Sequence, residues 1–312
     1  MKILVTGAAG FIGSHASERL ASMGHELVAI DNFSSYYEVS LKELNSEALS
    51  KKGIKVHKID LRTDDLSEII TEDLDYIFHF AAQPGISASS SFDDYLSNNF
   101  IGTQRLLDAI EKIVSKPFFV NIATSSVYGL EATLTEDQAP LPASWYGVTK
   151  LAAEQLVLAY SRRQMLQACS LRLYSVYGPR ERPDKLYTRL IDCGLNDKVF
   201  PLYEGSEAHL RSFTYVQDII DGIVSVIGKE ALCNGEIFNL GTEEENTTAT
   251  GISTVEEILQ KKIKIENKPA RPGDQSRTRA NIDKARRLLN YNPTTGLKEG
   301  LETQVKWFKE SF

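Results

Sequence analysis

The strongest constraint on the fold is a glycine-rich turn near the start of the chain. Gly7, Gly10 and Gly13 stand three residues apart, between an apolar run at 2–8 and an amphipathic helical pattern at 11–23. Glycines at such a junction permit a tight turn and let a diphosphate approach the positive end of the following helix. The same glycines could also serve only to pack the helix on the strand.

The alternation of strand and helix patterns predicts the fold class. Apolar runs at 26–32, 55–61, 76–82 and 118–125 are typical of further strands, and helical periodicity lies between them, notably at 99–113. Strands joined by helical crossovers form βαβ units. We therefore predict an α/β fold with a Rossmann-type doubly wound parallel sheet, and 312 residues leave room for a smaller companion domain.

An acidic residue supports a dinucleotide at the turn. Asp31 ends the second expected strand, eighteen residues after Gly13. A carboxylate there can accept hydrogen bonds from an adenosine ribose and would repel a 2′-phosphate. With the strand, the helix and the acid in place, we interpret the turn as a cofactor site that favours NAD over NADP.

The second half of the chain has a different texture. Prolines punctuate 175–205, the stretch 246–253 is polar and typical of a loop, and 235–241 has the pattern of a strand returning to the first sheet. We expect two interleaved domains. The NAD-binding domain is predicted at 1–174 plus about 211–241, and the smaller C-terminal substrate-binding domain at 175–210 and 242–312.

Composition excludes several classes of function. A formal net charge of −7 argues against a nucleic-acid binder, which needs a basic face. No apolar run reaches membrane length, and the five histidines show no metal-ligand spacing, so we expect neither a membrane partner nor a metal. Three cysteines without a CxxC pair suit a reducing compartment, so we expect a soluble cytoplasmic protein.

A tyrosine, a lysine and a threonine form the candidate catalytic set. Tyr146 and Lys150 stand at i and i+4 in a long helical pattern, so they share one helix face. A nearby ammonium, together with a positive nicotinamide, would lower the pKa of the phenol and make it a base. Thr124 ends the fifth expected strand, where an open parallel sheet binds its ligands. Alone, this common spacing would better suit a core tyrosine and a surface lysine.

These features together resemble the extended short-chain dehydrogenase/reductase family, specifically its nucleotide-sugar-modifying branch. The resemblance runs from residue 1 to about 310. It rests on GAAGFIGSH (7–15), AAQ (81–83), TSSVYG (124–129), YGVTK (146–150), YSVYGPRERPD (174–184), RSFTYVQD (211–218) and RPGD (271–274).

The resemblance implies specific binding residues. Those implied for NAD are Gly7, Gly10, Phe11, Ile12, Gly13, Asp31, Asn32, Asp60, Leu61, Ala81, Ala82, Gln83, Tyr146, Lys150, Tyr174 and Val176. Those implied for a UDP-sugar are Thr124, Ser125, Ser126, Ser175, Arg182, Val199, Tyr203, Arg211, Arg271 and Asp274. Arg211 and Arg271 match the arginines that grip the UDP diphosphate in the family.

Two serines favour one reaction among those of the family. Dehydratases carry Asp and Glu directly after the strand-end threonine, and uronate decarboxylases usually carry Glu in the second place. This chain has Ser125 and Ser126 instead, and an unactivated hydroxyl cannot do that acid–base work. The family then implies 4-epimerisation: Tyr146 removes the O4 proton, the sugar is oxidised at C4, turns over and is reduced on its other face. Lys150 holds the nicotinamide ribose and tunes Tyr146, Thr124 positions O4, and NAD stays tightly bound.

An RPD segment favours a uronate substrate. Arg182, Pro183 and Asp184 match UDP-glucuronate 4-epimerases, as do the stretches at 33–44 and 81–89. We hypothesise that Arg182 pairs with the sugar carboxylate, and with Ser125 or Ser126 holds it where CO₂ is not lost from the β-keto acid. Alternatively, Arg182 only caps a loop.

Other readings stay open at this stage. A UDP-glucuronate decarboxylase, a 4-epimerase of UDP-glucose or UDP-N-acetylglucosamine, and a non-enzymatic NAD-binding regulator are the rivals. Ser175 replaces an asparagine of the galactose-type enzymes, and the stretch 243–254 has no assigned contacts. His79 is expected in the core. Two helices, at 99–113 and 146–162, carry apolar residues on more than one face, and the family implies that they build a homodimer.

Overall fold

Seven parallel strands form the central sheet of the computed structural model, which describes residues 1–85, 90–270 and 275–312. The sheet order is β12-β7-β5-β4-β1-β2-β3. The strands are β1 (Lys2–Thr6), β2 (Glu26–Asp31), β3 (Val56–Lys58), β4 (Tyr76–His79), β5 (Phe118–Thr124), β7 (Ala168–Leu173) and β12 (Ile237–Leu240). The chain order reverses between β1 and β4, and this switch point is where such sheets bind ligands. The predicted fold class is confirmed, and β12 returns to the sheet beside β7 as expected.

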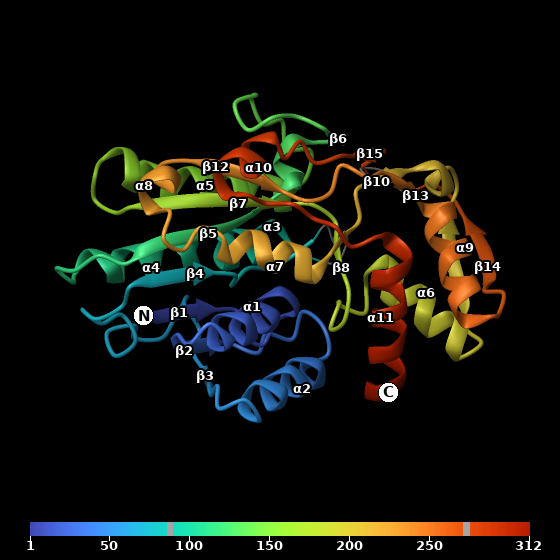
Figure 1. Ribbon diagram of the computed structural model, residues 1–312, viewed down its shortest axis with the longest axis horizontal. Helices are drawn as coiled ribbons and strands as arrows, with labels where there is room; N and C mark the ends of the chain where they lie inside the picture. The colour runs from blue at the N-terminus through green and yellow to red at the C-terminus, as the bar shows by residue number, and fades with distance from the viewer. Residues whose placement is uncertain (86–89, 271–274) are drawn as a thin grey trace.

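Helices cover both faces of this sheet (Figure 1). The elements on one face are α1 (Phe11–Ser22), α2 (Val39–Ser50), α7 (Val216–Val224) and α10 (Asp283–Leu289), with the short α8 (Glu230–Cys233) at its edge. The elements on the other are α3 (Phe92–Tyr95), a π-helical segment (Leu96–Ile101), α4 (Gly102–Glu111) and α5 (Trp145–Arg162). The helix expected at 99–113 is thus a π-helical turn followed by α4.

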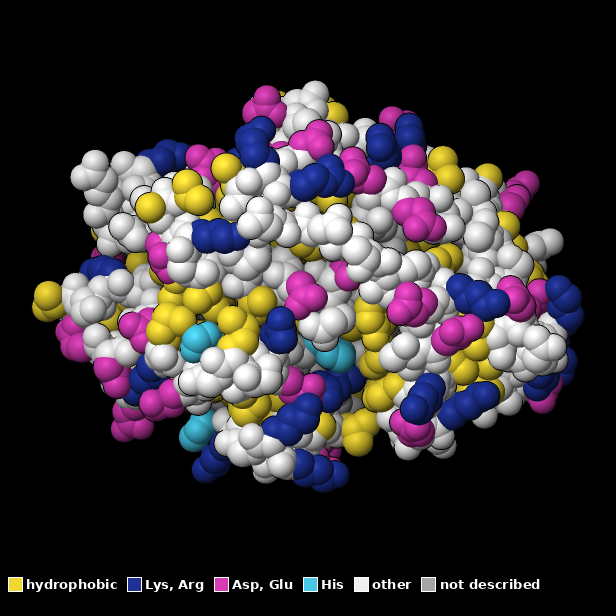
Figure 2. Space-filling model, in the orientation of Figure 1, with side chains coloured by type: hydrophobic (Ala, Val, Ile, Leu, Met, Phe, Trp, Pro, Cys, Tyr) yellow, Lys and Arg dark blue, Asp and Glu magenta, His cyan; other side chains and the backbone are white. Residues whose placement is uncertain are grey.

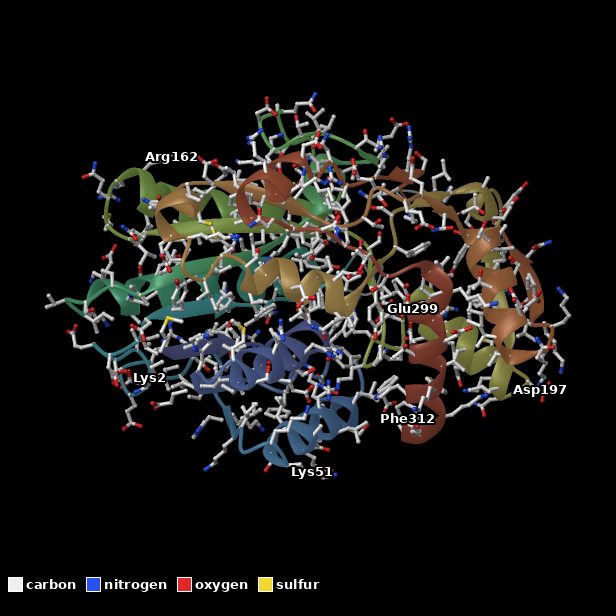
Figure 3. The ribbon with its side chains drawn as sticks, in the orientation of Figure 1. Lys2, Lys51, Arg162, Asp197, Glu299 and Phe312 are labelled. Atoms are coloured by element: carbon white, nitrogen blue, oxygen red, sulfur yellow. The ribbon has the colours of Figure 1, made fainter. Side chains whose placement is uncertain are left out.

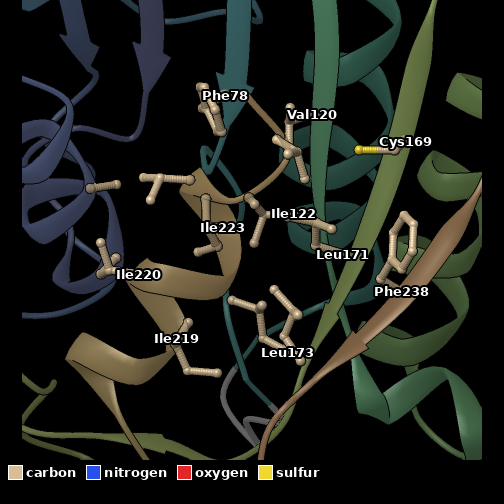
Figure 4. Close-up of a cluster of buried hydrophobic side chains, with 14 of the residues drawn as sticks. Phe78, Val120, Ile122, Cys169, Leu171, Leu173, Ile219, Ile220, Ile223 and Phe238 are labelled. Atoms are coloured by element: carbon tan, nitrogen blue, oxygen red, sulfur yellow. The ribbon is translucent and has the colours of Figure 1, made fainter. Parts of the chain in front are cut away.

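The strand period of two residues divides the core into two layers. Ile3 and Val5 of β1 pack in one buried cluster, whereas Leu4 between them packs in the other. Figure 4 shows the first cluster, in which Ile219 and Ile223 of α7 lie against the side chains of β4, β5, β7 and β12. Each such aliphatic side chain, when fully buried, contributes roughly 1.5–3 kcal/mol to stability.

A second region lies to the right in Figure 1 and has its own core. It contains α6 (Leu186–Leu195), β9 (Val199–Tyr203), α9 (Thr248–Leu259), β14 (Lys264–Lys268) and α11 (Leu297–Ser311). In Figure 3, Arg162 at the end of α5 and Asp197 just after α6 mark opposite sides of the molecule. Between the prolines that punctuate 175–205, α6 forms and buries Leu190 and Ile191.

The stretch 246–253 was predicted as a loop, and this is wrong. Helix α9 already begins at Thr248, because the Thr247 hydroxyl accepts a hydrogen bond from the Thr250 N–H and caps the first turn. Gly251 lets this turn approach Tyr187, since a Cβ there would lie 2.9 Å from the tyrosine ring. Helix α9 therefore begins among polar threonines, within the stretch that composition alone predicts to be a loop.

Short strands tie the two regions together. One small sheet has the order β13 (Asn246–Thr247), β10 (Leu210–Arg211), β15 (Arg277–Thr278) and β6 (Glu131–Ala132), and β8 (Val176–Tyr177) pairs with β11 (Thr214–Tyr215). Two 3-10 turns complete the chain, at Ser125–Tyr128 and Ser206–Ala208. Helix α10 packs on the large sheet through Ala285 and Leu289, although it follows the segment expected to bind substrate. The two regions are interleaved more closely than the sequence boundaries suggested.

The surface charges, the helix lengths and the cysteines add little information about the function of the protein. Figure 2 shows acidic and basic side chains interspersed over the visible face. Within residues 1–85, 90–270 and 275–312, every helix falls short of the length and apolar character needed to cross a bilayer. The same residues bring no three His, Cys, Asp or Glu side chains into a metal-binding group. Cys169, Cys193 and Cys233 are free and buried.

A buried ion pair joins α5 to the sheet. Glu154 of α5 and Arg172 of β7 lie 2.6 Å apart and are 0% and 1% exposed. Arg172 also donates to the Tyr128 hydroxyl at 2.8 Å, and Ser170 donates to Glu154 at 3.1 Å. The pair therefore sits inside a hydrogen-bonded network, which offsets the cost of removing both charges from water.

Removing one partner of this pair should destabilise the protein strongly. We expect Arg172→Met to lower the free energy of unfolding by about 3–5 kcal/mol, because Glu154 would stay buried without its counter-ion. Urea denaturation measures this loss. The double variant Glu154→Leu/Arg172→Met should recover most of it, and a double variant as unstable as the single one would contradict this explanation.

Candidate active site

A cleft of about 900 Å³ lies at the carboxyl edge of the large sheet, between the two regions. Its wall comes from the turn after β1, the ends of β2, β4 and β5, the start of α5, and the segments 181–189 and 200–213. This is the position in which open parallel sheets bind ligands. It brings residues from both halves of the chain to one space.

The glycine turn lines the cleft and packs tightly against the protein's own backbone. Gly7 has φ +70°, and a Cβ on it would lie 2.8 Å from the Ala81 backbone nitrogen. A Cβ on Gly13 would overlap the Gly7 carbonyl oxygen. Gly10 caps α1 and has no side chain to satisfy the first N–H groups of the helix. The residues present therefore fit the diphosphate of a dinucleotide.

Asp31 lies buried at the end of β2 and is 6% exposed. Its carboxylate accepts hydrogen bonds from the Ala9 and Phe33 N–H groups at 3.1 and 2.8 Å. Burial raises the pKa of Asp31, while the ammonium of Lys42 opposes that rise. The carboxylate keeps further lone pairs that can accept hydrogen bonds from ribose hydroxyls.

A second acid, Asp60, lines the same cleft. Asp60 accepts from Asn32 at 3.2 Å and pairs with Arg62, whose Nη2 lies 2.7 Å away. The hydrogen bonds of Arg62 lower the pKa of Asp60 to about 2, so this carboxylate stays charged. Asn32 is thereby held at the rim of the cleft.

Tyr146 and Lys150 reach the cleft from the first turns of α5. The Ser144 hydroxyl caps this helix by accepting from the Gly147 N–H at 3.1 Å. A Cβ on Gly147 would lie 2.6 Å from the Ser126 carbonyl oxygen, so the helix start packs directly on the turn after β5. Close packing here places Tyr146 beside Thr124, with which it shares a hydrogen bond.

Opposing effects act on the Tyr146 phenol. Burial is the largest effect and raises its pKa above the ordinary tyrosine value, while hydrogen bonds from Thr124 and from the Gly85 N–H, together with the charge of Arg182, oppose that rise. Arg182 is the strongest cationic influence, although the sequence pattern connected that arginine only with the substrate. Donors and a cation directed at the phenol oxygen stabilise the phenolate that a base requires.

Lys150 donates a hydrogen bond to the backbone of β5. Its Nζ donates to the Ile122 carbonyl oxygen at 2.6 Å, and the side chain is 3% exposed. Burial lowers its pKa to about 8, and the charge of Glu154, one helical turn away, opposes that effect. The remaining ammonium protons can be donated into the cleft.

Arg182 is the central cation of the opposite wall. Its Nε and Nη2 donate to the two carboxylate oxygens of Asp184 at 3.1 and 3.0 Å. Its guanidinium lies over the Tyr36 ring, 5.6 Å from the centroid. The side chain is only 8% exposed.

Further cations surround Arg182 in the cleft. Burial lowers the pKa of the Lys185 ammonium, and the charges of Arg182 and Arg211 lower it further. Arg211 donates to the carbonyl oxygens of Leu210 and Gln275. Arg189 stacks on Phe200, 5.4 Å from the ring centroid. This concentration of positive charge suits an anionic ligand inside a protein whose net charge is negative.

A comparison with protein families decides the identity of the chain. The family model described as GDP-mannose 4,6 dehydratase matches residues 4–304. The chain belongs to this family. The resemblance to extended short-chain dehydrogenases/reductases of the nucleotide-sugar branch is thereby confirmed.

Similar proteins include several epimerases. A crystal structure of UDP-glucuronic acid 4-epimerase from Bacillus cereus, in complex with UDP-glucuronic acid and NAD, is 38% identical, has a TM-score of 0.94 and is matched over 100% of both chains. The uncharacterized UDP-glucose epimerase YtcB of Bacillus subtilis (strain 168) is 39% identical over 100% of this chain and 99% of its own length. UDP-glucuronate 4-epimerase 1 of Arabidopsis thaliana is 34% identical over 99% of this chain and 76% of its own length.

Most of the site residues predicted from the sequence line the cleft. On the cofactor side these are Gly7, Gly10, Phe11, Ile12, Gly13, Asp31, Asn32, Asp60, Leu61, Ala81, Ala82 and Val176. On the catalytic and substrate side they are Thr124, Ser125, Ser126, Tyr146, Lys150, Ser175, Arg182, Tyr203 and Arg211. Arg271 and Asp274 lie outside the described residues.

The side chains of three expected residues do not line the cleft. Tyr174 is fully buried, and its ring lies 6.3 Å from that of Tyr128 in the core. Gln83 turns its amide to the Ser90 hydroxyl at 2.9 Å. Val199, the first residue of β9, is 51% exposed, whereas the four residues after it face the cleft. Strand direction and local packing orient each of these side chains away.

Sequence reasoning missed several cleft residues. Tyr36, Lys42, Gly85 and Lys185 all line the cleft but were not singled out. The 33–44 stretch, which carries the first two, did contribute to the family resemblance, so a signal existed there. Gly85 likewise lies in the stretch 81–89, which contributed to the resemblance, whereas Lys185 carries no comparable local pattern.

His79 is a structural residue, as expected from its strand position. It is 1% exposed, and its two ring nitrogens bond the hydroxyls of Thr6 and Thr103 at 2.8 and 2.9 Å. Burial, and secondarily the charge of Lys150, lowers its pKa to about 3. It therefore stays neutral at physiological pH and does not transfer protons there.

The lowered pKa of Lys150 predicts a pH dependence of stability. Between about pH 8 and the ordinary lysine value of about 10.4, the unfolded state binds a proton that the folded state has released. The stability of the wild type should therefore rise across this interval relative to Lys150→Met. Urea denaturation of both proteins from pH 7 to pH 10 measures this; a constant difference would exclude the lowered pKa.

Proposed function

We propose that the protein is an NAD-dependent 4-epimerase that interconverts UDP-glucuronate and UDP-galacturonate. The observation that carries the proposal is a buried arginine, Arg182, that lies close enough to the Tyr146 phenol for its charge to oppose the rise in the phenol pKa. A base that acts on O4 has the C5 substituent of the sugar close by. A cation at that place suits a carboxylate on C5, as in a uronate.

NAD is the proposed cofactor, tightly held and recycled in each turnover. Its support is the glycine turn, the buried Asp31 and the NAD found in the Bacillus cereus structure. When bound, NAD⁺ accepts a hydride from C4 of the sugar and returns it to the opposite face. Lys150 is proposed to hold the nicotinamide ribose, and Asp31 and Asn32 the adenosine ribose.

The chain's own groups manage the proton of the sugar hydroxyl. Tyr146, as phenolate, removes the proton from O4, and as phenol it later returns one. Thr124 hydrogen-bonds Tyr146 and can also contact O4, so it keeps the two oxygens in line. Between the two steps the 4-keto sugar rotates about its diphosphate linkage, and this rotation needs a cleft wide enough for the sugar to turn over.

Two serines make dehydration and decarboxylation less suitable. Ser125 and Ser126 line the cleft directly after Thr124, where the resemblance implies Asp and Glu in the dehydratases. A hydroxyl with no activating base is a poor general acid or base. As hydrogen-bond donors, the two serines can instead help Arg182 to hold the sugar carboxylate.

In this proposal the two regions bind different ligands, and Arg211 lies at the boundary between them. Residues 1–174 and about 211–241 hold NAD, and residues 175–210 and 242–312 hold the nucleotide sugar. Arg211 is proposed to bind the diphosphate, together with Arg271, and Tyr203 to lie along the uridine. The cations Lys185 and Arg189 add charge on the same side.

Proton NMR without added cofactor tests the proposed function. Incubation with UDP-glucuronate should give the signals of UDP-galacturonate, because copurified NAD is regenerated in each cycle. Tyr146→Phe should lower kcat by roughly 10²–10⁴-fold, since the proton acceptor is lost. Tyr160→Phe, on the same helix but outside the cleft, is the matched control. A UDP-pentose as product would indicate a decarboxylase, and conversion of neutral UDP-hexoses alone would exclude the uronate assignment.

We also infer that the protein forms a homodimer through α5. Trp145 and Val148 on its outer face are 56% and 42% exposed, and Phe92 packs edge-on against Trp145 with centroids 6.2 Å apart. Helix α4 differs from expectation, because its Leu106, Leu107 and Ile110 are buried and its outer face is polar. The apolar surface that supports a dimer therefore comes mainly from α5 and α3.

A charge on this apolar surface should separate the two copies. We expect Val148→Arg to convert the dimer to a monomer, because two like charges would meet across a two-fold interface. Light scattering coupled to size exclusion measures the mass. Val114→Arg, on a loop residue that is 89% exposed, is the control. A monomeric wild type, or an unchanged mass of Val148→Arg, would contradict the dimer through α5.

The cytoplasm is the proposed compartment. Its support is chemical: Cys169, Cys193 and Cys233 are all free and buried. Free thiols persist in reducing compartments. Nucleotide sugars and NAD are intracellular metabolites, which agrees with this placement.

A further inference from the structure

Asp184 holds one edge of the Arg182 guanidinium. The two hydrogen bonds between them use the Nε–H and one N–H of Nη2, at 3.1 and 3.0 Å. Asp184 is 49% exposed, whereas Arg182 is 8% exposed. The carboxylate binds the arginine in the fork geometry that guanidinium and carboxylate prefer, and both side chains line the cleft.

Two further contacts restrict where the guanidinium can lie. The Tyr36 ring lies beneath it, and Gly85 approaches it from the loop after β4. Gly85 has φ +78°, and a Cβ on it would lie 2.8 Å from Nη2 of Arg182. Any other residue at 85 would be strained and would also displace the arginine.

The remaining edge of Arg182 is the one left for a ligand. A guanidinium has five N–H donors, and Asp184 takes two on the side-on edge. Nη1 makes no hydrogen bond with the part of the chain that the structure describes, and Arg182 lines the cleft. The edge formed by Nη1 and the second N–H of Nη2 can therefore donate two hydrogen bonds to one carboxylate.

We propose that Asp184 is a positioning residue that sets substrate specificity through Arg182. It fixes the side-on edge so that the opposite edge receives the carboxylate of a UDP-uronate. This inference rests on the proposed function and extends it to a residue that need not touch the substrate. Gly85 completes the arrangement, because its N–H bonds the Tyr146 hydroxyl while its missing side chain makes room for Arg182.

The orientation of the carboxylate controls a side reaction. The 4-keto uronate is a β-keto acid, and its C5–C6 bond breaks when that bond stands perpendicular to the ketone plane. CO₂ then leaves, the bonding electrons form an enolate across C4 and C5, and a proton added at C5 gives a UDP-4-keto-pentose. The hydride removed from C4 then remains on the cofactor. A loosely held Arg182 would permit this alignment more often.

Binding measurements with two ligands test the proposal. Asp184→Ala should weaken the affinity for UDP-glucuronate by about tenfold, since a charge-assisted pair that orients Arg182 is lost. The affinity for UDP, which has no sugar carboxylate, should stay within about twofold. Isothermal titration calorimetry gives both constants. Asp184→Glu, which retains a carboxylate, should recover much of the loss.

The controls separate a positioning role from a general one. Asp192→Ala removes the same charge and an ion pair with Lys198 from α6, outside the cleft, and should leave both affinities unchanged. Arg182→Ala should show the loss for UDP-glucuronate, and the double variant Asp184→Ala/Arg182→Ala should lose no more than Arg182→Ala alone. NMR and absorbance near 340 nm should show more UDP-4-keto-pentose and reduced cofactor with Asp184→Ala.

Several outcomes would overturn the inference. Equal losses for UDP and UDP-glucuronate, unchanged affinity in Asp184→Ala, or additive losses in the double variant would each exclude positioning through Arg182. The binding arm needs no turnover. A wild type that binds UDP-glucuronate through Arg182 and Asp184 but does not epimerise it would therefore contradict the proposed function alone.

Discussion

The ion pair between Glu154 and Arg172 is the interaction on which the site depends most. It joins α5 to β7 in the fully buried core, and Tyr128 and Ser170 extend it as a hydrogen-bonded network. Because α5 carries Tyr146 and Lys150 at its start, the pair determines where both side chains lie relative to the strand ends. Glu154 also acts on Lys150 electrostatically, so one carboxylate supports the position of the helix and the charge of the lysine.

The cleft concentrates charge although the chain is acidic overall. Arg182 and Lys185 line it from the segment before α6 and Arg211 lines it from β10, while Asp31 and Asp60 line it at the carboxyl ends of β2 and β3. Charges of both signs are paired there, since Lys42 acts on Asp31, and ion pairs join Arg62 to Asp60 and Arg182 to Asp184. Burial strengthens these interactions, because a low local dielectric screens them less than bulk water does. The same burial keeps His79 neutral and outside the chemistry.

Some parts of the fold and the site could be predicted because their signals are local. The glycine spacing at 7–13, the alternation of strands and helices, and the i, i+4 pair of Tyr146 and Lys150 each depend on neighbouring residues. The structure differs where distant contacts overrule local pattern. Tyr174 packs in the core beside Tyr128, and α9 starts at Thr248 because Thr247 caps it and Gly251 fits against Tyr187. Neither contact is visible in composition or periodicity.

The sequence by itself determined the fold class, the glycine turn at the end of the first strand and the candidate catalytic set of Tyr146, Lys150 and Thr124. Backbone geometry and side-chain period act over a few residues, so these features can be recognised in the linear chain. Only the tertiary structure decided which groups surround the Tyr146 oxygen. Gly85 and Arg182 come from different regions, and Asp184 acts on the site through Arg182. Their meeting depends on how the second region packs against the sheet, which is a property of the whole core rather than of any one segment.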